Sequence, residues 1–218
     1  MTHIATWKYR LDLHIHTRCY SPCAEALDPD RLPEIMRHKR LDGVVITEHD
    51  QLWPAAEIAA LNRRLKLGRI YRGVEVSSCN GHFIVIGLDD MGGIRPGIGI
   101  KDLIQAANKQ NAAVIWAHPF LNYGNVPEPL SLVKMPQGIH ALEAVSGVTQ
   151  GENTAKALAF SLQRGWVAVG GSDAHVPGQV GCVYTRFPRL PKNEKTLAAA
   201  IRSGKCKIEV NLSRSKCF

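Results

Sequence analysis

Short apolar segments alternate with helical patterns along the whole chain. Most of these segments are continuously apolar and rich in β-branched residues, which is typical of strands covered on both faces. Strands separated by helices predict parallel pairing with right-handed crossovers, and therefore an α/β fold. The predicted strands are Arg10–Ile15, Gly43–Thr47, Ile70–Val76, His82–Gly87, Ala113–Ala117, Ile139–Val145, Trp166–Gly170 and Lys207–Val210.

Helical patterns fill the gaps between the predicted strands. Pro54 suits the first position of one helix, and Gly68 suits its end. Pro33 lies too deep for a helix that starts at Pro29, so that helix is expected to begin later. The apolar positions that mark the other helical faces are Ile58, Leu61 and Leu65; Leu103, Ile104 and Ala107; Ala155, Leu158, Ala159 and Leu162, before Gly165; and Leu197, Ala200 and Ile201, before Gly204.

Composition places the chain among ordinary globular proteins. Its 218 residues suffice for one sizeable domain, and its 45% hydrophobic and 21% charged residues argue against disorder. No apolar run approaches the roughly 20 residues of a membrane helix, and the first ten residues do not resemble a signal peptide. We therefore expect residues 1–218 to form a single cytoplasmic domain with no membrane segment. Without an export signal, the six cysteines are expected to be thiols.

Charge indicates the kind of partner. A net charge of +8 favours anionic partners, either small phosphorylated molecules or nucleic acid. The densest basic stretch, residues 63–72, is interpreted as a solvated helix face and its exit, and no interleaved aromatic residues suggest base stacking. Nucleic acid stays open as a partner, and the oligomeric state cannot be read from the sequence.

Ionisable residues occur in pairs at the ends of the predicted strands. His14 and His16 are two residues apart, so in a strand both side chains lie on one face and form a ready metal chelate. Asp173 and His175 repeat this spacing. Glu75 lies inside an apolar strand, where an unpaired carboxylate is costly to bury unless a metal ion is present.

Six of the nine histidines lie at the boundaries of apolar strands, and independent core histidines would not favour one end of a barrel in this way. Imidazoles and carboxylates suit zinc, manganese or iron. A bound ion can lower the pKa of water to ~7, which makes hydroxide available to attack phosphorus. His3 and His38 are given no role, and His140 is interpreted as structural. The six histidines are His14, His16, His49, His82, His118 and His175.

Five ordered motifs between residues 12 and 175 resemble those of the polymerase and histidinol phosphatase (PHP) family. The resemblance implies a distorted seven-stranded β/α barrel with a centre of two or three divalent metal ions. Members of the family include histidinol phosphatases, nucleotide and nucleic-acid phosphoesterases, and domains attached to DNA polymerases. The motifs are Asp12-Leu13-His14-Ile15-His16-Thr17, Ile46-Thr47-Glu48-His49-Asp50, Gly73-Val74-Glu75, Ala117-His118-Pro119 and Gly171-Ser172-Asp173-Ala174-His175.

The resemblance also implies a ligand set. Glu48 departs from the aspartate common at its position, and we expect it outside the ligand set. Where three-metal members usually offer a histidine or aspartate, this chain has Pro22 and Cys23, and Cys23 is either a soft ligand or a buried small residue. We therefore expect two firmly bound ions and a weaker third. The implied ligands are His14, His16, Glu75 and Asp173 for one ion, Glu75, His82 and His118 for a second, and His49 and His175 for a third.

The function predicted from this pattern is hydrolysis of a small phosphomonoester or nucleotide by metal-activated hydroxide. Asp173 is the candidate for carrying the proton, because it would lie beside that hydroxide. Arg18 and Arg186 are either phosphate contacts or ordinary surface arginines. The glycine-rich residues 91–99 lack the Lys-Ser/Thr ending of a P-loop.

Other functions remain open. They are a nuclease acting on nucleic-acid ends and a non-catalytic PHP module that binds metal for regulation or partner binding. An amidohydrolase is less favoured, because no lysine falls at a predicted strand end. Histidinol phosphate is possible as the substrate but is not favoured.

Overall fold

The computed structural model describes residues 6–66, 68–121, 136–148 and 151–210. His3 and Cys217 lie outside these residues. One nine-stranded sheet runs through the described part in the order β7-β6-β5-β4-β3-β2-β1-β8-β9. Its strands are β1 (Tyr9–Ile15), β2 (Gly43–His49), β3 (Arg69–Ser78), β4 (Gly81–Ile86), β5 (Ala113–Trp116), β6 (Ala141–Ser146), β7 (Val167–Gly171), β8 (Val183–Phe187) and β9 (Lys207–Val210).

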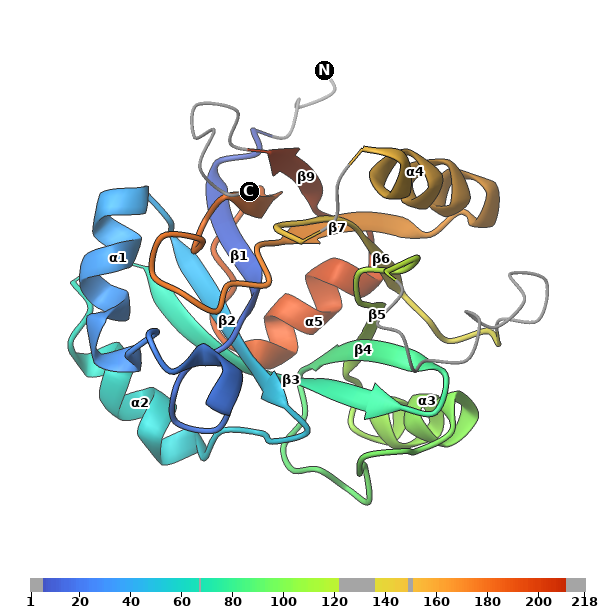
Figure 1. Ribbon diagram of the computed structural model, residues 1–218, viewed down its shortest axis with the longest axis horizontal. Helices are drawn as coiled ribbons and strands as arrows, with labels where there is room; N and C mark the ends of the chain where they lie inside the picture. The colour runs from blue at the N-terminus through green and yellow to red at the C-terminus, as the bar shows by residue number, and fades with distance from the viewer. Residues whose placement is uncertain (1–5, 67, 122–135, 149–150, 211–218) are drawn as a thin grey trace.

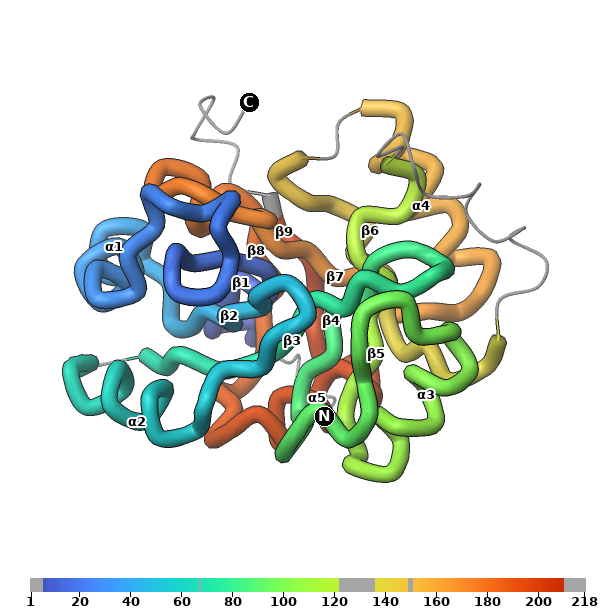
Figure 2. The backbone as a smooth tube through the Cα atoms, turned by 60° about the horizontal axis from the view of Figure 1, so that its bottom comes forward, coloured from blue at the N-terminus to red at the C-terminus, as the bar shows by residue number. Residues whose placement is uncertain are grey.

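The helices lie on both sides of this sheet and within its curve. Figure 2 shows α1 and α2 on one side of the strands and α3 and α4 on the other. No helix in the described ranges is long and apolar enough to cross a membrane. The helices are α1 (Leu32–Lys39), α2 (Ala55–Arg63), α3 (Ile100–Lys109), α4 (Glu152–Arg164) and α5 (Glu194–Arg202), with short 3₁₀ turns η1 (Pro22–Ala24) and η2 (Pro29–Arg31).

The sheet curls until its first and seventh strands nearly meet. Just beyond β1, the His16 backbone N–H donates to the Ala174 carbonyl at 2.9 Å, and an isolated parallel bridge joins Ile15 to Ala174. The mixed α/β barrel-like fold is confirmed, but the expectation of seven strands is wrong, since the sheet has nine.

The prediction of parallel pairing throughout is also wrong. β4 runs antiparallel to both β3 and β5, and β8 and β9 are antiparallel to their neighbours. Only Cys79 and Asn80 separate β3 from β4, and a parallel crossover needs a dozen or more residues. This hairpin places His82, at the start of β4, opposite Ser77 near the end of β3.

The strand β8 was missed because it is not a continuous apolar run. It alternates Val183, Thr185 and Phe187 with Tyr184 and Arg186, and it pairs antiparallel with β1 and β9. Short strands of this kind carry β-branched and aromatic residues, but the difference in hydrophobicity between their two faces is small. β8 shares backbone pairing with β1, the strand that carries His14.

Helix α5 fills the interior of the curved sheet. Leu197, Ala198 and Ile201 are fully buried and pack against inward-facing strand residues such as Leu13 and Phe187. Figure 1 shows α5 in the middle of the ring of strands. The remaining helices cover the outer faces, where α1 and α2 pack over β1 to β3 and α3 and α4 over β3 to β6.

The predicted apolar face of α4 is wrong. Leu162 is 83% exposed and Leu158 is 36% exposed, whereas Ala157 and Phe160 are buried. A helix with leucines and alanines around most of its circumference offers two apolar stripes, and packing selects one. Here the stripe that contains the bulkier Phe160 is buried, because the Phe160 ring lies against Trp116 and Trp166.

One boundary prediction needs a smaller change, and another is confirmed. Pro54 caps α2 instead of starting it, and the helix ends at Arg63, well before Gly68. α1 begins at Leu32, after a 3₁₀ turn capped by Asp28, so Pro33 falls in the first turn, where its missing N–H costs nothing.

Candidate metal centre

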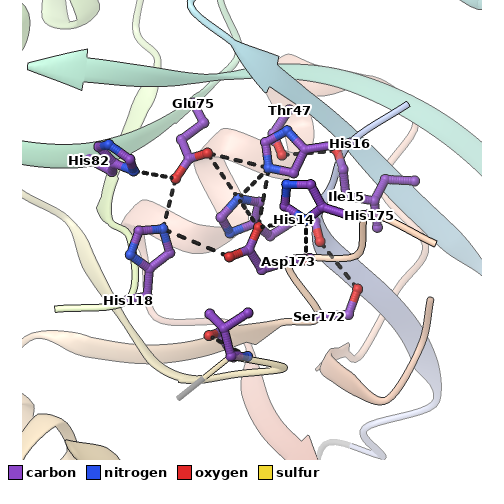
Figure 3. Close-up of polar contacts among 12 residues, drawn as sticks. His14, Ile15, His16, Thr47, Glu75, His82, His118, Ser172, Asp173 and His175 are labelled. Atoms are coloured by element: carbon purple, nitrogen blue, oxygen red, sulfur yellow. Dashed lines mark hydrogen bonds and ion pairs between the residues drawn. The ribbon is translucent and has the colours of Figure 1, made fainter. Parts of the chain in front are cut away.

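The eight predicted ligands lie together at one end of the curved sheet (Figure 3). β1 and the residue after it supply two of them, the segment after β7 supplies two more, and β2, β3, β4 and the segment after β5 supply one each. Because β4 is antiparallel, its amino end lies beside the carboxyl end of β3. The donor atoms form four overlapping groups, each with its atoms within 4.8 Å of one another: His14, His16, Glu75 and Asp173; Glu75, His82 and His118; His16, His49 and His175; and His14, His118 and Glu143.

Glu75 lies between two sets of imidazoles. Its Oε1 is 2.8 Å from His118 Nε2 and 3.1 Å from His82 Nδ1. Its Oε2 faces the other way, 3.0 Å from His49 Nδ1 and 3.3 Å from His16 Nε2. The carboxylate is 1% exposed, so its two oxygens are directed to two different groups of buried donors. This is the arrangement required of a carboxylate that bridges two ions.

The His14 and His16 side chains point their ring nitrogens at each other. Their Nε2 atoms are 3.1 Å apart, and each lies within 3.3 Å of Asp173 Oδ1. Two neutral imidazole lone pairs at this distance repel, and Glu75 Oε2 is buried without a hydrogen-bond partner in the described part of the chain. A divalent cation among these atoms would satisfy all of them, so the residues present fit a metal ion.

Charges within the cluster hold one another in their ionised forms. Burial raises the pKa of Glu75, but His14, His118 and His16 lower it more, so the net pKa lies well below its usual range. Burial also raises the pKa of Asp173, but His14 and His16 lower it more, so its net pKa lies below the usual range. Both carboxylates are therefore ionised and available as ligands at neutral pH.

Backbone strain accompanies two of the predicted ligands. Asp173 has φ of 52° and His118 has φ of 23°, both in the left-handed region that side chains other than glycine rarely occupy. Conformations of this kind cost of order 1–3 kcal/mol and persist where the surrounding structure enforces them. The strain thus falls on residues whose side chains enter the cluster.

Comparisons with known proteins agree with this geometry. Residues 151–206 match the family model described as PHP-associated. A two-domain protein from Bacteroides vulgatus that contains a predicted PHP-like metal-dependent phosphoesterase has the same fold, with a TM-score of 0.70 and 19% identity over 93% of this chain and 64% of that one. The chain thus resembles PHP-associated proteins over residues 151–206 and shares the fold of a PHP-like protein.

Two further proteins are similar to this chain. An uncharacterized protein of Methanocaldococcus jannaschii, MJ0417, is 26% identical over 189 residues, which are 83% of this chain and 71% of that protein. The lesion-specific endonuclease PfuEndoQ of Pyrococcus furiosus shares the fold, with a TM-score of 0.66 and 18% identity over 92% of this chain and 57% of that one. At such identity the structural likeness establishes the fold alone.

The predicted ligands of the third ion, His49 and His175, are the most exposed of the eight. His49 is 34% exposed and His175 is 28% exposed, whereas His14 and His16 are fully buried. His175 Nδ1 donates to the Asp173 carbonyl oxygen at 2.9 Å, which leaves Nε2 free to bind. Burial and then His16 lower the pKa of His175, so its imidazole is neutral, the form that binds metal.

Glu48 lies outside the four donor groups. Its Oε1 accepts hydrogen bonds from the Thr17 hydroxyl and from Trp53 Nε1 at 2.8 Å, and its Oε2 accepts from the Thr17 backbone N–H at 3.1 Å. Both oxygens thus bind the segment that follows His16. Glu48 anchors that segment to β2.

Cys23 does not match either expectation for it. The thiol is exposed, so the prediction of a buried residue is wrong, and within the described chain it belongs to none of the donor groups. Ser21 occupies the buried position in this loop. Its Oγ lies 3.3 Å from His16 Nδ1 and accepts from the His49 backbone N–H at 3.3 Å.

The two candidate phosphate arginines are each paired with an acidic residue outside the cluster. Arg18 forms an ion pair with Asp28 at 2.7 Å. Arg186 is held by Glu209, and it pairs with Arg10 at the opposite end of β1 from His14. Within the described residues, neither forms an ion pair with a carboxylate of the cluster.

One residue of the site was missed in the sequence. Glu143 lies in β6, is 1% exposed, and places Oε1 3.1 Å from His14 Nδ1. Its sequence signal is the one that identified Glu75, a lone carboxylate inside an apolar strand, here Ala141-Leu142-Glu143-Ala144-Val145. The signal was passed over because Glu143 belongs to none of the five motifs.

Proposed function

We propose that this chain is a metal-dependent phosphoesterase that hydrolyses a small phosphomonoester or a nucleotide. The observation that carries the proposal is the position of Glu75, buried between His118 and His82 on one side and His49 and His16 on the other. A single carboxylate between two imidazole sets suits adjacent ions, and adjacent ions suit phosphate esters.

The proposed ligands follow the donor groups. His14, His16, Glu75 and Asp173 hold one ion, Glu75, His82 and His118 a second, and His49 and His175 a weaker third. When bound, divalent ions such as zinc, manganese or iron polarise phosphoryl oxygens and acidify water.

The chain's own side chains supply orientation and proton transfer. Asp173 is the proposed proton carrier, because its carboxylate is ionised and lies among the donor atoms of two buried histidines. Arg18 is retained as the proposed phosphate contact, since it lies two residues after His16 and its side chain is 54% exposed. Arg186 is not assigned this role, because Glu209 holds its guanidinium.

The second candidate is a nuclease. The observations that favour it are the net charge of +8 and the fold shared with PfuEndoQ. Hydrolysis of a nucleic-acid phosphodiester and of a phosphomonoester both require a metal centre that promotes attack at phosphorus. The two candidates therefore differ in how the rest of the substrate is bound.

A panel of phosphate esters tests the proposal. Purified protein is supplied with manganese, zinc or iron and assayed on phosphomonoesters, nucleotides, phosphodiesters and oligonucleotides, beside a His14→Ala, Asp173→Ala double variant. Metal-dependent turnover of monoesters that disappears in the double variant supports the phosphoesterase. Turnover of oligonucleotides alone supports the nuclease, and bound metal without any turnover favours a non-catalytic binding module.

A further inference from the structure

Glu143 connects two residues of the metal centre that come from different strands. Its Oε1 lies 3.1 Å from His14 Nδ1, and its Oε2 accepts the backbone N–H of His118 at 2.9 Å. Both carboxylate oxygens are therefore occupied, one by a side chain of β1 and one by the main chain that follows β5. The side chain is 1% exposed, so no water competes for these contacts.

The two nitrogens of His14 face in different directions. Nδ1 faces Glu143, whereas Nε2 faces the donor cluster, 3.1 Å from His16 Nε2 and 3.3 Å from Asp173 Oδ1. A carboxylate beside Nδ1 favours the tautomer with its proton on Nδ1, and the lone pair on Nε2 is then directed at the cluster. The carboxylate thus determines which nitrogen of His14 is free to bind metal.

Gly171 leaves room for this contact. A Cβ at that position would lie 2.5 Å from the Cβ of His14 and 2.9 Å from Glu143 Oε1, closer than atoms approach without displacement. β7 therefore passes directly over the Glu143–His14 pair, and a side chain there would push the two apart.

We propose that Glu143 is a positioning residue that sets the tautomer and ring orientation of His14 and fixes the backbone of His118. The inference rests on the proposed function in one respect, because it takes His14 and His118 to be ligands of divalent ions. It adds a residue that lies outside the five sequence motifs and binds no ion itself.

The test compares metal binding by the wild-type chain and by Glu143→Gln. A glutamine must place its amide nitrogen against either His14 Nδ1 or the His118 N–H, so one of the two contacts is lost at nearly unchanged volume. We expect the same number of zinc equivalents as in the wild type, with the dissociation constants of the tight sites raised about 10–100-fold in competition with a chelator. Glu209→Gln, which removes a carboxylate paired with Arg186, is the matched control and should bind zinc as the wild type does.

A spectroscopic measurement separates positioning from packing. In the zinc-loaded wild type, long-range proton–nitrogen spectra should find the His14 proton on Nδ1, and this signal should shift or vanish in Glu143→Gln. A His14 ring with its proton on Nε2 would overturn the inference, even if the variant failed to fold.

The other outcomes are equally distinct. Unchanged zinc affinity in Glu143→Gln would overturn the positioning role and leave the proposed function intact. Loss of one whole equivalent would also overturn it, since Glu143 would then be a ligand. A wild type that binds no divalent ion would overturn both proposals together.

Discussion

Asp12 Oδ2 accepts the backbone N–H of Gly181 at 2.8 Å, although 169 residues separate the two in the chain. Its Oδ1 accepts the backbone N–H of Ser172 at the same distance. Asp12 is fully buried, and burial raises its pKa to about 6 despite these hydrogen bonds. One carboxylate thereby attaches β1 to both ends of the loop that carries Asp173 and His175.

Replacing Asp12 with Asn should loosen this loop. Both oxygens accept from backbone N–H groups, so an amide nitrogen must face a donor on one side. We expect the free energy of unfolding to fall by about 1–3 kcal/mol, measured in urea, with weaker zinc binding. Asp42→Asn is the control, because Asp42 holds a backbone N–H of Arg10 far from the cluster, and its metal affinity should not change. Equal zinc affinity in Asp12→Asn would contradict the role.

Metal counting should separate two kinds of site. We expect two tight equivalents and a weaker third, because His49 and His175 are the most exposed of the eight donors, and His82 is the one partly exposed donor of the first two sites. A His49→Ala, His175→Ala variant should lose the weak equivalent alone, whereas His82→Ala should lose a tight one. Equilibrium dialysis with elemental analysis measures both, and three tight equivalents in the wild type would exclude this scheme.

Removing the metal should lower thermal stability. Ions that bind the folded state alone add about 2.7 kcal/mol at a free concentration 100 times the dissociation constant. Treatment with a chelator should therefore lower Tm, and zinc should restore it. The His14→Ala, Asp173→Ala variant, which lacks two ligands of the first ion, should show a smaller response, and an unchanged wild-type Tm would argue against bound metal.

The surroundings of His140, remote from the cluster, predict that the free energy of unfolding depends on pH. Its Nδ1 accepts the Val114 backbone N–H at 3.1 Å, so protonation of the ring removes the acceptor. Burial and then Arg202 lower the pKa of His140. A histidine whose pKa is lowered by folding contributes stability that is present above the unfolded pKa and is lost as pH falls through the folded value.

Urea unfolding at pH 7 and pH 5 tests this expectation. The wild type should lose more free energy of unfolding on acidification than His140→Asn, whose amide oxygen can accept the same hydrogen bond. His38→Asn serves as the control, since His38 is exposed and pairs only weakly with Glu34. The same acid loss in the wild type and His140→Asn would show that His140 is not responsible.

The two faces of α4 should respond differently to mutation. Phe160→Ala removes a buried ring that contacts Trp116 and Trp166, and should cost about 3–5 kcal/mol of stability. Leu162→Lys should change stability by less than about 0.5 kcal/mol, because Leu162 is 83% exposed. Chemical denaturation of both variants measures the contrast, and a large loss in Leu162→Lys would mean that this side chain is covered in solution.

The sequence predicted the donors better than it predicted their scaffold. His14 and His16 followed from a two-residue spacing, and Glu75 from the cost of burying a carboxylate in an apolar strand. The direction of β4 did not follow, because strand polarity depends on connection length, and the Cys79-Asn80 turn was not considered as a hairpin.

Other misses have separate physical causes. Glu143 carries the same signal as Glu75, but its function depends on a neighbour that lies 129 residues away in the chain. The buried side of α4 depends on which aromatic ring meets Trp116, and helical periodicity alone leaves two answers. The predictions for Cys23 rested on its position in the loop, where three-metal members have a histidine or aspartate. In this chain Ser21 takes the buried position beside His16.

The hydrogen bond between His16 and Ala174, which closes the sheet, also determines when the centre can assemble. Glu75, His82 and His118 lie within one stretch of chain and can meet as soon as β3, β4 and β5 have paired. The group that includes Asp173 must wait until β7 has been synthesised and docked against β1. During translation, all three residues of the first group therefore leave the ribosome before Asp173 does.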